Sequence, residues 1–166
     1  MRTAMRLPPE SSTTGTGDAL DELERDHRDV EQLFARASLT DGERRLAILP
    51  NIVEALTVHA QVEEDVVYPA IAAAVGGGDV LTDQSTGEHA EIKELVERLA
   101  QTSTDGPQLV ADLRELQLVV QAHVAVEEGE LFPAYRAQAT KKQLKQLSVA
   151  AGKTRAAAAT ATSGKE

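Results

Sequence analysis

Hydrophobic residues recur at intervals of three and four along most of this chain, the spacing that places them on one face of an α-helix. Four stretches carry the pattern: from near residue 18 to just before 39, from about 43 to 67, from after the glycine run 76–78 to about 100, and from 107 to Pro133. The connections between them are short and rich in Gly, Thr and Asp. The pattern therefore predicts four long helices.

Prolines and the two ends of the chain refine this prediction. Pro50 is expected to kink the second helix, and Pro69 and Pro133 are expected to end or bend the second and fourth. A cationic stretch from about 141 to 151 predicts a short fifth helix that could cap one end of the bundle. The composition of the two ends predicts flexible tails over 1–16 and 152–166. The folded domain is thus expected to span residues 17–151.

Histidines occupy positions on these apolar faces where the helical pattern predicts aliphatic residues. In two copies of one motif, His59 precedes Glu63 and His123 precedes Glu127, each by four positions, and one copy lies in each half of the chain. Residues four apart on a helix lie one turn above each other on the same face. Each copy continues with a second Glu and then an aromatic residue, Pro and Ala. Each motif is therefore a potential chelating pair.

The other two histidines complete a repeat. His27 precedes the first motif and His89 precedes the second by nearly the same interval, and both follow an acidic residue. A repeat unit of about 64 residues, with two helices, cannot bury its apolar face alone. Two units predict an all-α, up-down-up-down four-helix bundle with a pseudo-twofold axis and all four histidines inside. One mismatch remains, because His27 and His59 differ by about six residues, roughly 9 Å, in their distance from the turn that joins them; a kink at Pro50 could absorb it.

Six buried polar groups in one core would be costly unless they bind something. The expected metal ligands are His27, His59, Glu63, His89, His123 and Glu127. In one plausible division, the first two histidines bind one ion and the last two bind another, while the two glutamates bridge the ions. The chain has no cysteine, so nitrogen and oxygen are the available ligand atoms. Iron or manganese suits such a site, and zinc fits without redox chemistry.

Charge and hydropathy limit the classes of partner that this protein is expected to bind. The net charge of −10 disfavours nucleic acid and anionic membranes, which attract basic surfaces. The first ten residues have no apolar core of a secretory signal, and no stretch is long and apolar enough to span a membrane. We therefore expect a cytoplasmic monomer or weak homodimer whose partners are small molecules such as peroxide, O2 or NO.

The order H, HxxxE, H, HxxxE resembles that of the hemerythrin-like, or HHE cation-binding, family over about residues 18–136. The resemblance implies a four-helix bundle around a non-haem di-iron centre with an oxo or hydroxo bridge. Hemerythrins themselves use five histidines, including an HxxxH pair, and end with HxxxxD. Here Ser85 and Lys93 stand four positions from His89, and the last motif ends at Glu127. The symmetrical pattern instead resembles a bacterial subgroup associated with catalase-type peroxide removal and with responses to oxygen or nitric oxide.

These observations favour a catalase-like di-iron oxidoreductase that acts in oxidative stress defence, with Glu63 and Glu127 as its catalytic carboxylates. Two alternatives remain: a protein that binds or senses O2, NO or iron without turnover, and a metal-storage or zinc-filled structural bundle. Neighbouring residues are given lesser roles. Glu64 and Glu128 are expected in solvent or around the ligands, with a role as auxiliary ligands as the alternative. Asp26 and Glu88 are expected to face water, with the orientation of an imidazole as the alternative. Tyr68, Phe132 and Tyr135 are expected in packing, while a tyrosyl hydroxyl near the metals would be a radical or proton source.

Overall fold

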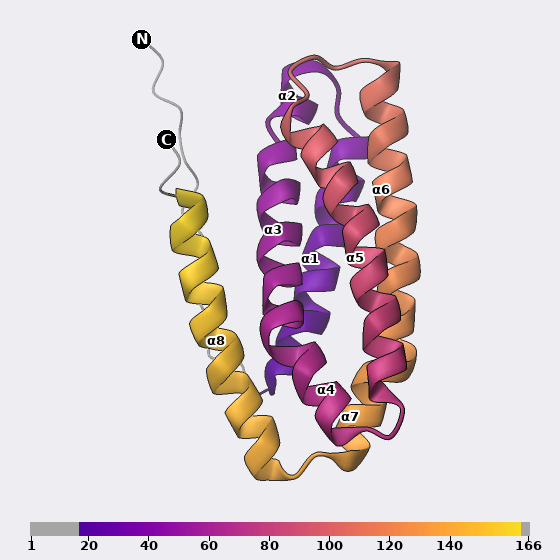
Figure 1. Ribbon diagram of the computed structural model, residues 1–166. Coiled ribbons are helices and arrows are strands. Elements are labelled where there is room, and N and C mark those ends of the chain that lie inside the picture. Colours follow the sequence, from indigo (N-terminus) through magenta and orange to yellow (C-terminus); the bar gives the residue numbers. More distant parts are fainter. Residues whose placement is uncertain (1–16, 164–166) are drawn as a thin grey trace.

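The computed structural model describes residues 17–163, and all regular secondary structure in that range is helical. Four long helices run side by side and alternate in direction (Figure 1). They are α1 (Ala19–Ser38), α3 (Leu49–Val62), α5 (Gly78–Ala100) and α6 (Pro107–Val126). This arrangement confirms the predicted up-down-up-down four-helix bundle. The expected tail over residues 1–16 lies outside the described residues.

The sequence placed His27 and His59 at different distances from the turn that joins their helices. The connection between the first two long helices removes this mismatch. A separate short helix, α2 (Gly42–Leu46), lies at the end of the bundle, so the second long helix begins at Leu49 rather than near Glu43. His27 and His59 then lie at nearly the same depth, each about three helical turns from the adjoining ends of α1 and α3. The predicted kink at Pro50 is wrong, because this proline stands in the first turn of α3, where its missing N–H is not needed.

The second and fourth helices each contain a π-helical turn that begins at a motif glutamate. At the ends of η1 (Glu63–Val67) and η2 (Glu127–Leu131), the backbone bonds reach five positions back instead of four: the Tyr68 N–H donates to the Glu63 carbonyl, and the Phe132 N–H donates to the Glu127 carbonyl. The α-helix then resumes as α4 (Tyr68–Ala74) and α7 (Phe132–Gln138). Pro69 and Pro133 were expected to end or bend these helices. Both helices continue past them, because each proline falls in the first turn of a resumed α segment, where no bond from its nitrogen is required.

The last helix is longer than expected and lies elsewhere. Helix α8 spans Lys141–Ser163, so the prediction that it ends near Ala151 was wrong. The segment after Gly152 contains four consecutive alanines, and alanine has the highest helix propensity. Instead of capping the bundle, α8 turns back along its side and packs on α1, α3 and η1 (Figure 1).

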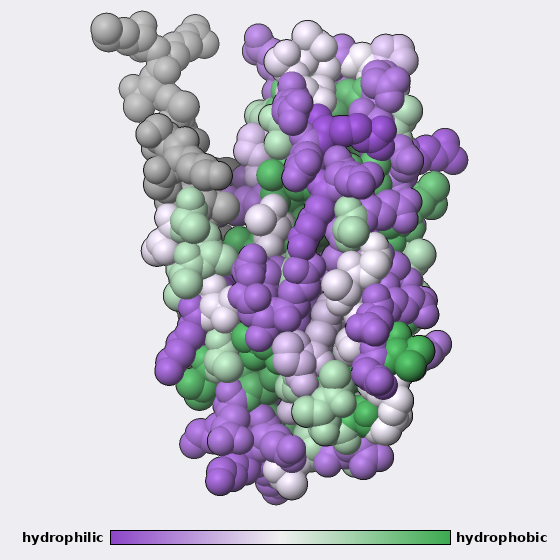
Figure 2. Space-filling view, viewed as in Figure 1, coloured by the Kyte–Doolittle hydropathy of each residue, from purple (hydrophilic) through white to green (hydrophobic). Residues whose placement is uncertain are grey.

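Two apolar clusters fill the interior, one on each side of the polar site. One contains Phe34, Ile52 and Leu116, and the other contains Leu20, Ile71 and Phe132 together with Leu147 and Ala151 of α8. Hydrophilic side chains cover much of the face seen in Figure 2, while hydrophobic ones gather where α8 approaches α4. The histidines and motif glutamates therefore lie in an intermediate layer, surrounded by packed hydrocarbon.

Candidate metal site

All six residues that the repeat singled out converge in this layer. They come from six helical segments, and none has more than 6% of its surface exposed: His27 on α1, His59 on α3, Glu63 on η1, His89 on α5, His123 on α6 and Glu127 on η2. Two overlapping groups of them are arranged so that they could hold metal ions: His27, His59, Glu63 and Glu127 in one, and Glu63, His89 and His123 in the other. Glu63 belongs to both groups.

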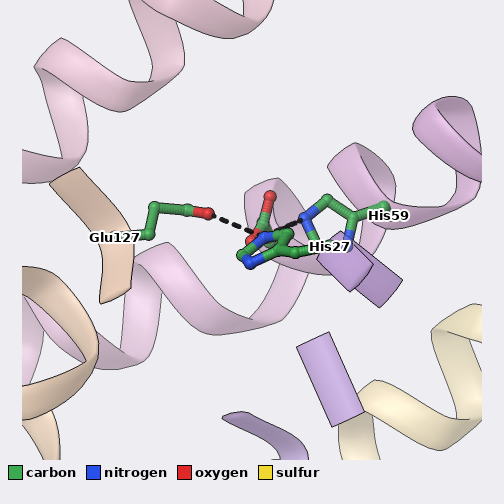
Figure 3. Close-up of side chains that lie close together, drawn as sticks. His27, His59 and Glu127 are labelled. Carbon is green, nitrogen blue, oxygen red and sulfur yellow. Dashed lines mark hydrogen bonds and ion pairs between the residues drawn. The ribbon is translucent and has the colours of Figure 1, made fainter. Parts of the chain in front are cut away.

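The imidazoles form two matched pairs. The Nε2 atoms of His27 and His59 are 3.0 Å apart, and those of His89 and His123 are also 3.0 Å apart. The two rings of each pair have centroids 4.6 Å apart. Figure 3 shows Glu127 directed at the first pair. The pseudo-twofold symmetry seen in the sequence therefore holds for the positions of the ring nitrogens.

Each motif glutamate connects the two pairs. Glu63 Oε1 lies 3.1 Å from His59 Nε2, and its Oε2 lies 3.2 Å from His89 Nε2. Glu127 Oε2 lies 3.3 Å from His27 Nε2 and 3.4 Å from His123 Nε2. Each carboxylate therefore contacts one histidine of its own motif and one histidine from the other half of the repeat.

The outward-facing Nδ1 atom of every histidine contacts a further carboxylate. The contacts are His27 to Glu128 at 2.8 Å, His59 to Asp26 at 3.4 Å, His89 to Glu64 at 2.9 Å and His123 to Glu88 at 2.9 Å. Asp26 and Glu88 were expected to face water, and the structure corrects this, because each reaches the histidine on the neighbouring helix. Such carboxylates fix the orientation of metal-binding imidazoles.

The outer layer bears on whether the imidazoles could hold a cation. A carboxylate only accepts hydrogen bonds, so each Nδ1 must donate, and a neutral ring then carries its lone pair on Nε2. In each pair those lone pairs face one another at 3.0 Å. They also face carboxylate oxygens that accept no well-directed hydrogen bond, both oxygens of Glu63 and Oε2 of Glu127. Such a cluster needs positive charge, from metal ions or from protons.

In the metal-free protein, protons supply that charge. Burial acts to lower the pKa of His59, but the charge of Glu63 and the close contacts with Asp26 and Glu63 outweigh it and raise the pKa to about 10. The pKa of His89 is also raised, against burial, by Glu63 and Glu64. Burial acts to raise the pKa of Glu63, but the facing histidines hold it well below its ordinary value. A metal ion must displace these protons, so binding should release them.

We expect the metal-free protein to lose thermal stability as the pH rises above neutrality. A pKa raised in the folded state contributes stability that is complete below the unfolded value, 6.5 for His59, and is lost as the pH rises towards about 10. The lowered pKa of Glu63 adds stability above its unfolded value of 4.5 and loses it in acid. Unfolding midpoints measured by circular dichroism should therefore fall between pH 6.5 and 10, and fall less with metal bound. A flat profile for the metal-free protein would contradict this charge assignment.

One residue breaks the symmetry of the site. The Tyr68 hydroxyl donates to Glu127 Oε1 at 2.7 Å and lies 3.2 Å from His89 Nε2, so this side chain reaches the site as well as packing in the core. Phe132 occupies the equivalent place and stacks on His27 with ring centroids 6.1 Å apart. Burial and the charges of Glu63 and Glu127 raise the pKa of Tyr68, so its hydroxyl stays protonated.

Space for a small ligand adjoins the imidazoles. A cavity of about 20 Å³, lined by the four histidines and by aliphatic side chains such as Val30 and Val120, is large enough for one water-sized molecule. A second pocket of about 110 Å³ between α1 and α6 is lined in part by the same side chains, among them His27, Val30 and Val120. The two spaces adjoin on the α1 and α6 side of the bundle.

Comparison of the sequence with protein families identifies the domain that carries this histidine and glutamate cluster. The profile of the hemerythrin HHE cation-binding domain matches residues 18–135. The chain belongs to this family, and the match covers the four long helices and both motifs.

Related sequences include proteins of different lengths. A DNA nickase of a Nostoc strain is 32% identical over 127 residues, which is 76% of this chain but 36% of that protein. The chain thus spans about a third of that relative. An uncharacterized protein of Mycobacterium tuberculosis, and one of Mycobacterium bovis, are 30% identical over 122 residues, 70% of this chain and 71% of theirs.

A solved structure shares the fold. The hemerythrin HHE cation-binding domain-containing protein of Mycobacterium kansasii superposes with a TM-score of 0.73 over 90% of this chain and 94% of that one, at 22% identity. Among the described residues, none of the helices combines the length and apolarity that crossing a membrane requires.

Proposed function

We propose that this protein binds two iron ions and that the iron-loaded form converts hydrogen peroxide to water and O2. His27 and His59 would hold one ion, His89 and His123 the other, and Glu63 would bridge them together with Glu127. The observation that carries the proposal is that the two halves of the site have the same arrangement of nitrogens and oxygens. Each has two Nε2 atoms 3.0 Å apart and oxygens from both glutamates within 3.4 Å of those nitrogens.

The donor atoms support iron or manganese. The site offers imidazole nitrogens and carboxylate oxygens and no thiolate, a set that suits iron or manganese. Zinc fits the same donors but supplies no redox chemistry. Turnover of peroxide therefore requires one of the redox-active ions.

Bound iron would relay two electrons from one H2O2, which is oxidised to O2 and loses two protons, to a second H2O2, which takes up two electrons and two protons and becomes two H2O. The chain's own residues would handle protons and water. Tyr68 keeps its proton and directs it at Glu127 Oε1, 2.7 Å away. The apolar clusters on either side keep bulk water from the imidazoles. A protonated hydroxyl in a site closed to bulk water suits peroxide chemistry.

The size of the spaces beside the imidazoles favours a very small substrate. The cavity at the imidazoles measures about 20 Å³, and the pocket beside it about 110 Å³. Peroxide, O2 and NO fit these spaces, and the cavity at the imidazoles is too small for larger organic molecules. One relative is a DNA nickase, but the net charge of −10 on this chain opposes binding to a polyanion such as DNA.

The proposal predicts O2 release from peroxide that depends on bound iron. Protein loaded with ferrous iron under anaerobic conditions and freed of excess metal should evolve O2 on addition of H2O2, as measured with an oxygen electrode. Metal-free and zinc-loaded protein are the controls and should show no more than the buffer. If iron-loaded protein shows no turnover but changes its optical spectrum with O2 or NO, it binds or senses these gases instead. If it takes up many more than two iron ions per chain without turnover, storage becomes the better interpretation.

A further inference from the structure

We infer that helix α8 is part of the metal site, with Arg155 as a positioning residue for the half that contains His27 and His59. This inference rests on the proposed binding of metal by those two histidines. The family profile ends at residue 135, so Arg155 lies outside the matched domain. The inference concerns the helix that follows the matched domain.

Arg155 is connected to a proposed ligand through one carboxylate. Its Nη2 donates to Asp26 Oδ2 at 2.6 Å, and the same oxygen lies 3.4 Å from His59 Nδ1. The Nε2 atom of His59 faces the site on the other side of the ring. The orientation of this imidazole therefore depends on Asp26, and that of Asp26 depends on a helix 129 residues later in the chain.

The other three outer carboxylates are held from within the four-helix bundle. Arg28 binds Glu128, Lys93 binds Glu64, and Gln84 binds Glu88. Among the four outer carboxylates of the described chain, only Asp26 has its partner on a helix that follows the bundle. Its contact with histidine is also the longest of the four, 3.4 Å against 2.8 to 2.9 Å. This half of the site is therefore the one that depends on α8.

Packing fixes the position of Arg155. Leu147 and Ala151, which stand about two turns and one turn before it on α8, are 4% and 2% exposed. Ser148 Oγ accepts a hydrogen bond from the backbone nitrogen of Ala19, at the start of α1, at 2.9 Å. Helix α8 thus lies against the two helices that carry His27 and His59, and it presents the guanidinium at the depth of Asp26.

Removing the guanidinium should weaken one of the two metal ions selectively. Loss of a partner that orients a metal-binding histidine typically costs about 10- to 100-fold in metal affinity. For Arg155→Ala loaded with two ferrous ions, we expect one ion to pass to a ferrous chelator about 10- to 100-fold faster than in the wild type, and the other at the wild-type rate. Absorbance of the iron–chelator complex under anaerobic conditions measures both phases.

Three matched variants separate this role from a general effect on the fold. Lys153→Ala removes the same charge from an exposed position of α8 and should leave both phases unchanged. Arg155→Lys keeps a donor for Asp26 and should restore most of the affinity. Gln84→Ala, in the outer layer of His123, should affect the other ion instead. The metal-free Arg155→Ala protein should melt within a few degrees of the wild type.

Two results would overturn the inference: release of both ions from Arg155→Ala at wild-type rates, or equal acceleration of both ions together with a large loss of metal-free stability. Absence of peroxide turnover is a different result. If the wild type binds two iron ions without turnover and Arg155→Ala still loses one of them selectively, the proposed enzymatic function fails and the role of α8 stands.

Discussion

A His123→Ala variant is expected to bind iron in its half of the site at least about 100-fold more weakly than the wild type, since loss of an outer partner alone costs about 10- to 100-fold. The variant removes one of two imidazoles 3.0 Å apart and frees Glu88 and Glu127 of their contacts with it. Its helix content should change little, because alanine favours helices. Iron per chain after dialysis against a weak chelator, with a circular dichroism spectrum, measures both effects.

The matched control for this variant is Leu118→Ala. This substitution truncates a side chain on the same helix as His123. Leu118 is 58% exposed and lies on a different face of the helix from the imidazole. The variant should retain two iron ions. A His123→Ala protein that keeps two iron equivalents at wild-type affinity would remove His123 from the set of ligands.

Glu63→Gln and Glu127→Gln should each lower O2 evolution per bound iron at least tenfold, which corresponds to about 1.4 kcal/mol of activation free energy. Glutamine preserves the shape of the side chain but removes its charge and replaces one oxygen by an amide nitrogen that does not bind iron. Both carboxylates contact histidines of both pairs, so either substitution would disturb the connection between the ions. Initial rates from an oxygen electrode, divided by the iron content, measure the effect.

The control for these substitutions must lie outside the outer layer. Glu130→Gln, on an exposed position of η2, is suitable and should change little. Glu64→Gln and Glu128→Gln are not neutral controls, because these glutamates contact His89 and His27. If both Glu63→Gln and Glu127→Gln turn over peroxide at the wild-type rate per iron, the bridging carboxylates have no role in catalysis.

The six central residues could be identified from the sequence because a single periodicity relates them. A residue and its neighbour four positions later share a helix face, so the motifs place His59 with Glu63 and His123 with Glu127 whatever the surroundings. The repeat then relates the two halves, and burial requires the polar faces to meet. The register of His27 with His59 could not be obtained in this way, because it depends on the separate helix α2, which absorbs the residues that were counted as part of the second helix.

Tertiary structure determines which way the side chains around the six central residues face. Asp26, Glu64, Glu88 and Glu128 each lie one position from a proposed ligand, about 100° round the helix, and only the neighbouring helix determines whether such a position faces water or a histidine. Tyr68 stands five positions after Glu63, which on an α-helix would turn it about 140° away. The π turn, in which the Tyr68 nitrogen bonds to the Glu63 carbonyl, brings it back towards the site.

The sequence by itself thus determined the helices, the repeat and the helix faces that carry the proposed ligands, because these follow from local spacing along one helix. Tertiary structure alone determined the hydrogen-bonded outer layer, the inward Tyr68 and the contact of Arg155 with Asp26, which joins residues 129 positions apart. Such contacts depend on how far one helix lies from another and how each is rotated about its axis. Packing of the whole chain sets both quantities, and no local pattern encodes them.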